Sequence, residues 1–112
     1  MQSGSDYEVR IKIEVNSHGD FTYSPAVKRI KPGQVVTWEC PQGPFSISFQ
    51  SKSPFTHLDF QSPRNDKVWM ATTHESGALP GPGHFHYTVA VFFIAEGRVF
   101  QDAGCPEIIV TT

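Results

Sequence analysis

The chain has few cysteines, no long hydrophobic run and no excess of charge of either sign. Its two cysteines, Cys40 and Cys105, form no CxxC motif and match no zinc-finger spacing. No segment approaches the roughly 18 apolar residues of a membrane-spanning helix, and nine basic against eleven acidic side chains give a net charge of −2. We therefore expect no membrane insertion, and no nucleic-acid binding, which needs clustered Lys and Arg.

The amino terminus also lacks the features of a targeting segment. Residues 1–6 are small and polar, without the basic start and apolar centre of a signal peptide. We expect a flexible segment over 1–6 and a single domain over 7–112, a length that supports its own core. As written, the sequence predicts a cytoplasmic protein, although a processed periplasmic or secreted form would read the same.

Short strands are the dominant pattern along the chain. Residues 7–15 alternate strictly between apolar and charged side chains, as in a strand with one face on the core. Nine glycines and nine prolines fall between such runs, and no stretch has a convincing helical period. The strands that we expect span residues 7–15, 27–30, 34–40, 45–49, 67–73, 84–94, 98–100 and 107–111. About eight short strands predict an all-β, two-sheet Greek-key β-sandwich.

Three stretches of the sequence resemble the cupredoxin family, and their order and spacing support the likeness better than any one stretch alone. The first is FTYSPAVKRIKPGQVVTW over residues 21–38, the second is PFSISF over 44–49, and the third is GHFHY over 83–87, which leads to Val89. Together with the last strand they cover most of residues 21–112. The resemblance implies a cupredoxin-like sandwich.

The ligands of a blue-copper site are missing from this frame. Cupredoxins hold copper through two histidines, a cysteine and usually a methionine. Phe45 stands at the place of the first histidine and Val89 at that of the cysteine, and no residue after His86 is a histidine or methionine. The chain is most similar to copper-less, uncharacterised bacterial members of the group, whose ends read much like PEIIV at 106–110. The resemblance thus implies a scaffold without electron transfer.

No hydrolase, metalloprotease or nucleotide-binding motif is present, so we predict a non-enzymatic interaction module with a protein partner and no cofactor. The irregular stretch 51–66 is the candidate binding surface, through Phe55, His57 and Phe60, because loops on a rigid sandwich carry function and exposed aromatic rings mark interfaces. The alternative is that both phenylalanines fold back as plugs over the end of the sandwich.

A copper or zinc protein with a non-standard site is the alternative function. His84 and His86 share a face of one expected strand, and a third ligand from an adjacent strand would complete a site for a divalent ion. His74 and Glu75, just before the Gly/Pro turn, are the candidates for that ligand. The resemblance also places Cys40 and Cys105 at the end that would house copper, which leaves a thiolate site or a redox-sensitive disulfide open. The plainer interpretations are a solvated histidine face and two small buried cysteines.

Overall fold

The computed structural model describes residues 8–49, 52–55, 59–61, 68–73, 78–79, 82–102, 104 and 106–111. Over these residues the chain is all-β, as predicted, with eleven strands rather than about eight. The elements are β1 (Glu8–Val15), β2 (Phe21–Ser24), β3 (Val27–Ile30), β4 (Val35–Cys40), β5 (Phe45–Ser48), β6 (Asp59–Gln61), β7 (Trp69–Thr72), β8 (Gly83–His86), β9 (Thr88–Phe93), the 3-10 turn η1 (Ile94–Glu96), β10 (Arg98–Gln101) and β11 (Glu107–Val110). No helix in this part of the chain is long and apolar enough to cross a membrane.

The additional strands arise where pairing partners organise weakly patterned sequence. β2 pairs with β1, and β6 forms within the irregular stretch 51–66 because it pairs with β5. The single strand expected over 84–94 is divided at Tyr87 into β8 and β9, and its last residue, Ile94, begins η1. Gly97 ends that turn with φ +64°, a left-handed conformation that glycine adopts without a steric penalty.

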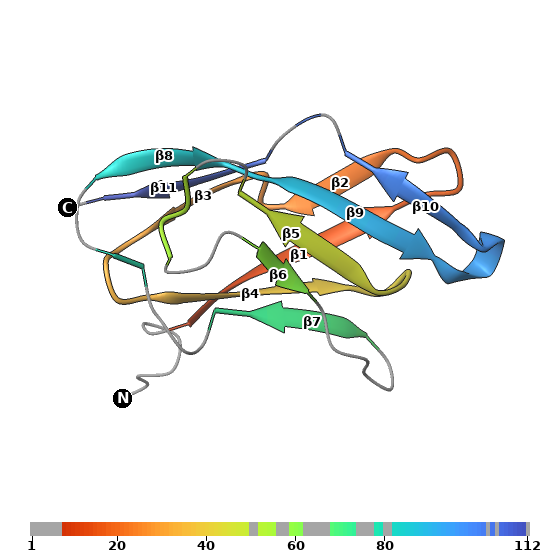
Figure 1. Ribbon diagram of the computed structural model, residues 1–112, viewed down its shortest axis with the longest axis horizontal. Coiled ribbons are helices and arrows are strands. Elements are labelled where there is room, and N and C mark those ends of the chain that lie inside the picture. The colour runs from red at the N-terminus through yellow and green to blue at the C-terminus, as the bar shows by residue number, and fades with distance from the viewer. Residues whose placement is uncertain are drawn as a thin grey trace.

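The strands form three sheets, in the orders β2–β1–β4–β7, β10–β9–β5–β6 and β3–β11–β8. The pairs β1–β4 and β3–β11 are parallel, and the other pairs are antiparallel. Only Tyr87 separates β8 from β9, so one continuous segment of chain links the second and third sheets (Figure 1). The arrangement is compatible with a β-sandwich in which the first sheet packs against the other two.

One hydrophobic core joins the sheets. Trp38 of the first sheet packs against Phe49 and Tyr87, with ring centroids 6.4 and 5.7 Å apart. All three are fully buried, and each such side chain contributes about 1.5–3 kcal/mol through burial of its apolar surface. The alternation expected for β1 is confirmed: the apolar residues Ile11, Ile13 and Val15 are buried, whereas the charged residues Arg10, Lys12 and Glu14 are exposed.

Candidate functional site

The two positions that the cupredoxin resemblance gives to copper ligands lie on neighbouring strands. In the register of β5 and β9, Phe45 pairs with Val91 and Ile47 pairs with Val89. Phe45 and Val89 are therefore diagonal neighbours on one face, and both are buried. Each belongs to the hydrophobic core. Neither side chain carries an atom that can bind a metal, so apolar packing occupies both positions.

Cys40 is a buried free thiol at the end of β4. Its Sγ lies 3.7 Å from Oε1 of Gln42, to which it donates a weak hydrogen bond. Burial raises the pKa of the Cys40 thiol above its ordinary value, which keeps it in the protonated form that neither attacks nor ligates readily. Cys105 lies outside the described residues, so the disulfide and the thiolate metal site stay predictions.

Two buried polar groups sit in the centre of the core. Among the described residues, neither the indole Nε1 of Trp38 nor the phenol oxygen of Tyr87 has a hydrogen-bond partner. Burial raises the pKa of Tyr87 well above its ordinary value, and the nearby Trp38 side chain offsets only part of this rise. Tyr87 is therefore neutral in the folded protein at ordinary pH.

The histidines predicted to share an outer face do so. His84 and His86 lie on β8 with 68% and 61% of their side chains exposed, whereas Phe85 between them packs against the core. His74 and Glu75, the candidate third ligands from before the Gly/Pro turn, lie outside the described residues. The adjacent strand β11 instead brings Glu107 to this face, opposite His86 in the strand register.

Glu107 joins the two histidines through one carboxylate oxygen. Its Oε2 lies 2.8 Å from Nδ1 of His84, a hydrogen bond, and 3.9 Å from Nε2 of His86. The carboxylate is only 17% exposed, so the strands hold it while the imidazole rings extend into solvent. We call His84, His86 and Glu107 the imidazole–carboxylate cluster. No group of three or more His, Cys, Asp or Glu side chains in the described ranges is already arranged to hold a metal ion.

Phe55 and Phe60, from the irregular stretch 51–66, pack against the core, as in the alternative in which both rings fold back. Phe55 is buried, and its ring makes edge contacts with Phe49 and Phe60 at centroid distances of 6.1 and 5.8 Å. The Phe55 ring is therefore packed in the core of the described structure, and its role in binding stays a prediction. Phe60 is half-buried against the same core, and its binding role stays a prediction. His57 lies outside the described residues.

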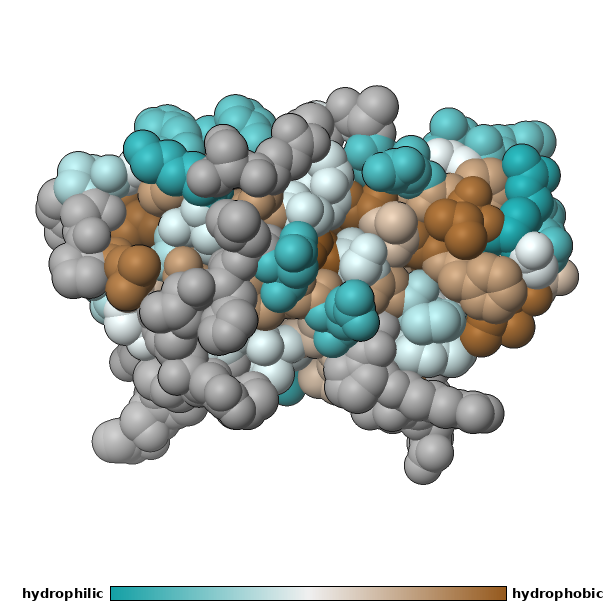
Figure 2. Space-filling view, in the orientation of Figure 1, coloured by the Kyte–Doolittle hydropathy of each residue, from teal (hydrophilic) through white to brown (hydrophobic). Residues whose placement is uncertain are grey.

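A different apolar surface covers the outer face of β9 and β10. Phe92 and Val99 pair across the two strands and remain 41% and 63% exposed, and Ile94 of the adjoining turn is also exposed. A shallow depression of about 280 Å³ adjoins these residues, and none of the side chains that line it is charged. Its lining consists of Pro44, Phe45, Ser46, Gln61, Ala90, Phe92 and Val99. Figure 2 shows hydrophobic residues gathered at the end of the molecule where β9 meets β10.

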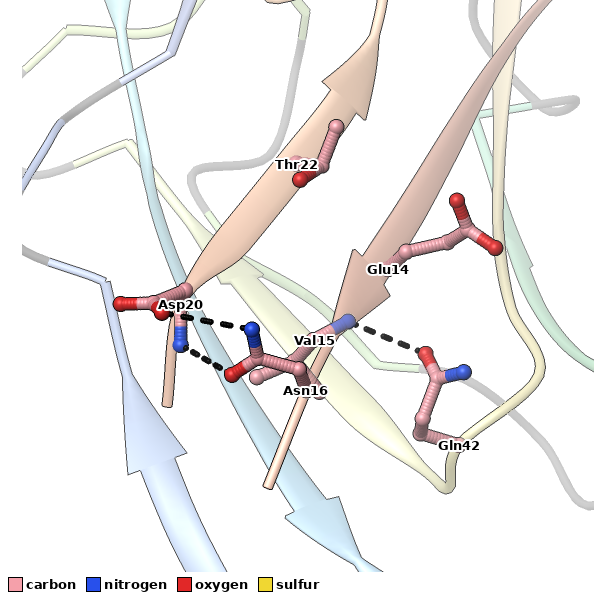
Figure 3. Close-up of a pocket in the computed structure, with 6 residues that line it drawn as sticks. All are labelled: Glu14, Val15, Asn16, Asp20, Thr22 and Gln42. Atoms are coloured by element: carbon pink, nitrogen blue, oxygen red, sulfur yellow. Dashed lines mark hydrogen bonds between the residues drawn. The ribbon is translucent and has the colours of Figure 1, made fainter. Parts of the chain in front are cut away.

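A polar depression of about 400 Å³ lies at the turn between β1 and β2 (Figure 3). Asn16 Oδ1 accepts backbone hydrogen bonds from His18 and Asp20, at 2.9 and 3.0 Å. Gln42 Oε1 accepts one from Val15 at 3.1 Å. These side chains stabilise the turn and tie it to the loop after β4, so we assign this depression a structural role.

No model of a known protein family matches the sequence, and a search of curated proteins finds no match either. The function must therefore be argued from the chain's own residues.

Proposed function

We propose that this chain is a non-enzymatic, cupredoxin-like binding module without a blue-copper site, and that a protein docks on the outer face of β9 and β10. The observation that carries the proposal is the contrast between the two sides of these strands. On the inner side, Val89 of β9 and Phe45 of the neighbouring β5 occupy the expected positions of two copper ligands, and neither side chain can bind a metal. The outer side of the strands exposes apolar residues, which in a binding module is a contact surface.

The chemistry of this surface indicates an apolar contact on the partner. Phe92 and Val99 lie side by side and line the uncharged depression. Arg98 and Glu96 flank them and approach one another at 3.8 Å. An apolar centre with charged residues at its edge is the usual anatomy of a protein interface, and the energy of binding concentrates in the apolar centre.

The test places a photo-crosslinking amino acid at position 99 and, as a matched control, at the similarly exposed Val27 on the outer face of β3. We expect a crosslink to one identifiable protein from position 99 and none from position 27. The purified partner should then bind the wild-type chain, and Phe92→Arg should weaken that binding by at least about tenfold, as for a central apolar contact.

Three outcomes would contradict the proposal. They are equal crosslinking at both positions, adducts only to a second copy of the chain, and binding that is unchanged by Phe92→Arg.

A copper titration tests the other half of the proposal, the absence of a blue-copper site. An intense visible copper–thiolate absorption would show a blue-copper site and overturn the assignment of Phe45 and Val89.

A further inference from the structure

We propose that the imidazole–carboxylate cluster binds one divalent transition-metal ion, with zinc as the preferred ion. His84, His86 and Glu107 are its three protein ligands. The strand register brings two imidazole nitrogens from β8 to the same carboxylate oxygen of Glu107 on β11, at 2.8 and 3.9 Å. Imidazole combined with carboxylate suits zinc and copper(II), and three protein ligands leave a position for water. The inference is independent of the cupredoxin resemblance and of the protein partner.

The two distances from Glu107 to the histidines are each within about 0.6 Å of those in a zinc site. Ligand atoms about 2.0–2.2 Å from zinc at tetrahedral angles lie about 3.4 Å from one another. The Glu107–His84 contact of 2.8 Å would have to lengthen by about 0.6 Å, and the Glu107–His86 contact of 3.9 Å would have to shorten by about 0.5 Å. His84 would carry its proton on Nε2 in the bound form, which leaves Nδ1 free to ligate.

The two imidazole rings would have to move to complete the site, and their exposure allows this movement. Both imidazole rings are more than half exposed, so they can turn about their side-chain bonds without disturbing the core. Glu107 is largely buried, and its backbone N–H donates to the carbonyl of Ala26 at 3.0 Å, so the carboxylate provides a fixed ligand. A small adjustment of the two rings therefore separates the observed arrangement from a complete site.

The neighbours on this face are largely apolar. Val27 pairs with Glu107 from β3, and Ile109 pairs with His84 from β11. Arg29 lies opposite Ile109 on the same face and is the nearby positive charge that a bound cation would meet. The Glu107 carboxylate lies nearer to the histidines in the register and partly balances the charge of the ion. The apolar residues bring no competing hydrogen-bond donor to the carboxylate.

The test is calorimetric titration of the full chain with zinc chloride, with the visible spectrum of cobalt(II) as a reporter of tetrahedral coordination. We expect one ion per chain. His84→Ala, His86→Ala and Glu107→Gln should each lower the affinity by at least about tenfold, since losing even an outer-shell partner of a ligand costs that much. His18→Ala removes another exposed histidine, in the β1–β2 turn, and should leave the affinity unchanged.

Thermal unfolding provides a second readout. Zinc should raise the unfolding midpoint of the wild type, because an ion that binds the folded state stabilises it. The double variant His84→Ala/His86→Ala should unfold at the metal-free midpoint whether zinc is present or not. Failure of the wild type to bind beyond weak surface chelation would overturn the proposal. Retention of wild-type affinity by the double variant would also overturn it and would assign the ion to other ligands.

Discussion

The two ends of the segment formed by β8 and β9 share one inner face but differ on their outer face. Tyr87, Val89 and Val91 point inward and are buried along its length. Outward, the β8 end carries two histidines beside Glu107, whereas the β9 end carries Phe92 beside Val99. This segment therefore presents a polar surface at one end and an apolar surface at the other.

The difference shows which part of this strand is constrained by folding. A residue on the inner face must fill the core, because each void there lowers the stability. A residue on the outer face meets only its cross-strand neighbour and solvent, so its chemistry can vary from one end to the other. We therefore look for function on the outer face and for stability on the inner one.

The largest expected effect comes from comparing a buried with an exposed phenylalanine. Phe55→Ala should lower the free energy of unfolding by about 3–5 kcal/mol, because it leaves a cavity against Phe49 and Phe60. Phe92→Ala removes the same atoms from the outer face and should cost less than about 1 kcal/mol. Urea unfolding followed by tryptophan fluorescence measures both values. Similar losses in the two variants would show that Phe92 supports the fold and would remove the distinction between the faces.

The sequence predicts the inner face well because burial repeats with the period of the backbone. The alternation over residues 7–15 and the exposed His84–His86 pair both follow from the side-chain period of two. β6 was not predicted, since Asp59–Gln61 has a single apolar residue, is too short to show a period, and is a strand through its pairing with β5. Its formation depends on partners that are distant in the chain.

The two candidate surfaces, around His84 and around Phe92, could be predicted only in part. They too depend on the pairing of strands that are distant in the chain. The two histidines were identified as a pair that needs a third ligand from an adjacent strand. Glu107 could not be chosen among the eleven acidic residues, because only the register of β8 against β11 brings it there. Phe92 and Val99 were likewise not predicted as a surface, since their exposure depends on which strands pair.

An intermediate effect is expected from Tyr87 on the inner face, and it appears as a dependence on pH. Burial raises the pKa of Tyr87 in the folded state, so the folded protein keeps this proton at a pH where the unfolded chain, with an ordinary pKa of about 10, has lost it. The unfolded state then binds fewer protons. The contribution of protonated Tyr87 to the stability of the folded state is therefore complete below about pH 10. Above that pH it falls by about 1.4 kcal/mol per pH unit.

Tyr87→Phe isolates this contribution. The variant should be at least as stable as the wild type at pH 7, because it removes a buried hydroxyl to which no described residue offers a hydrogen bond. Urea unfolding at pH 7, 10 and 11 measures the free energy of unfolding of both proteins. Between pH 10 and pH 11 the wild type should lose more stability than the variant. Parallel losses in the two proteins would mean that the Tyr87 hydroxyl ionises as readily in the folded state as in the unfolded chain.

The smallest effect is expected from His84 in the absence of metal. Its hydrogen bond to Glu107 lies on the outer face with most of the imidazole in solvent, and pairs of this kind contribute about 0.2–1 kcal/mol. His84→Ala should therefore lower the free energy of unfolding by less than about 1 kcal/mol. His86→Ala, which removes only the 3.9 Å contact, should cost no more. A loss above about 2 kcal/mol for either variant would exceed what an exposed pair contributes. The cluster would then hold β8 to β11, and the polar end of the outer face would be constrained by folding as the inner face is.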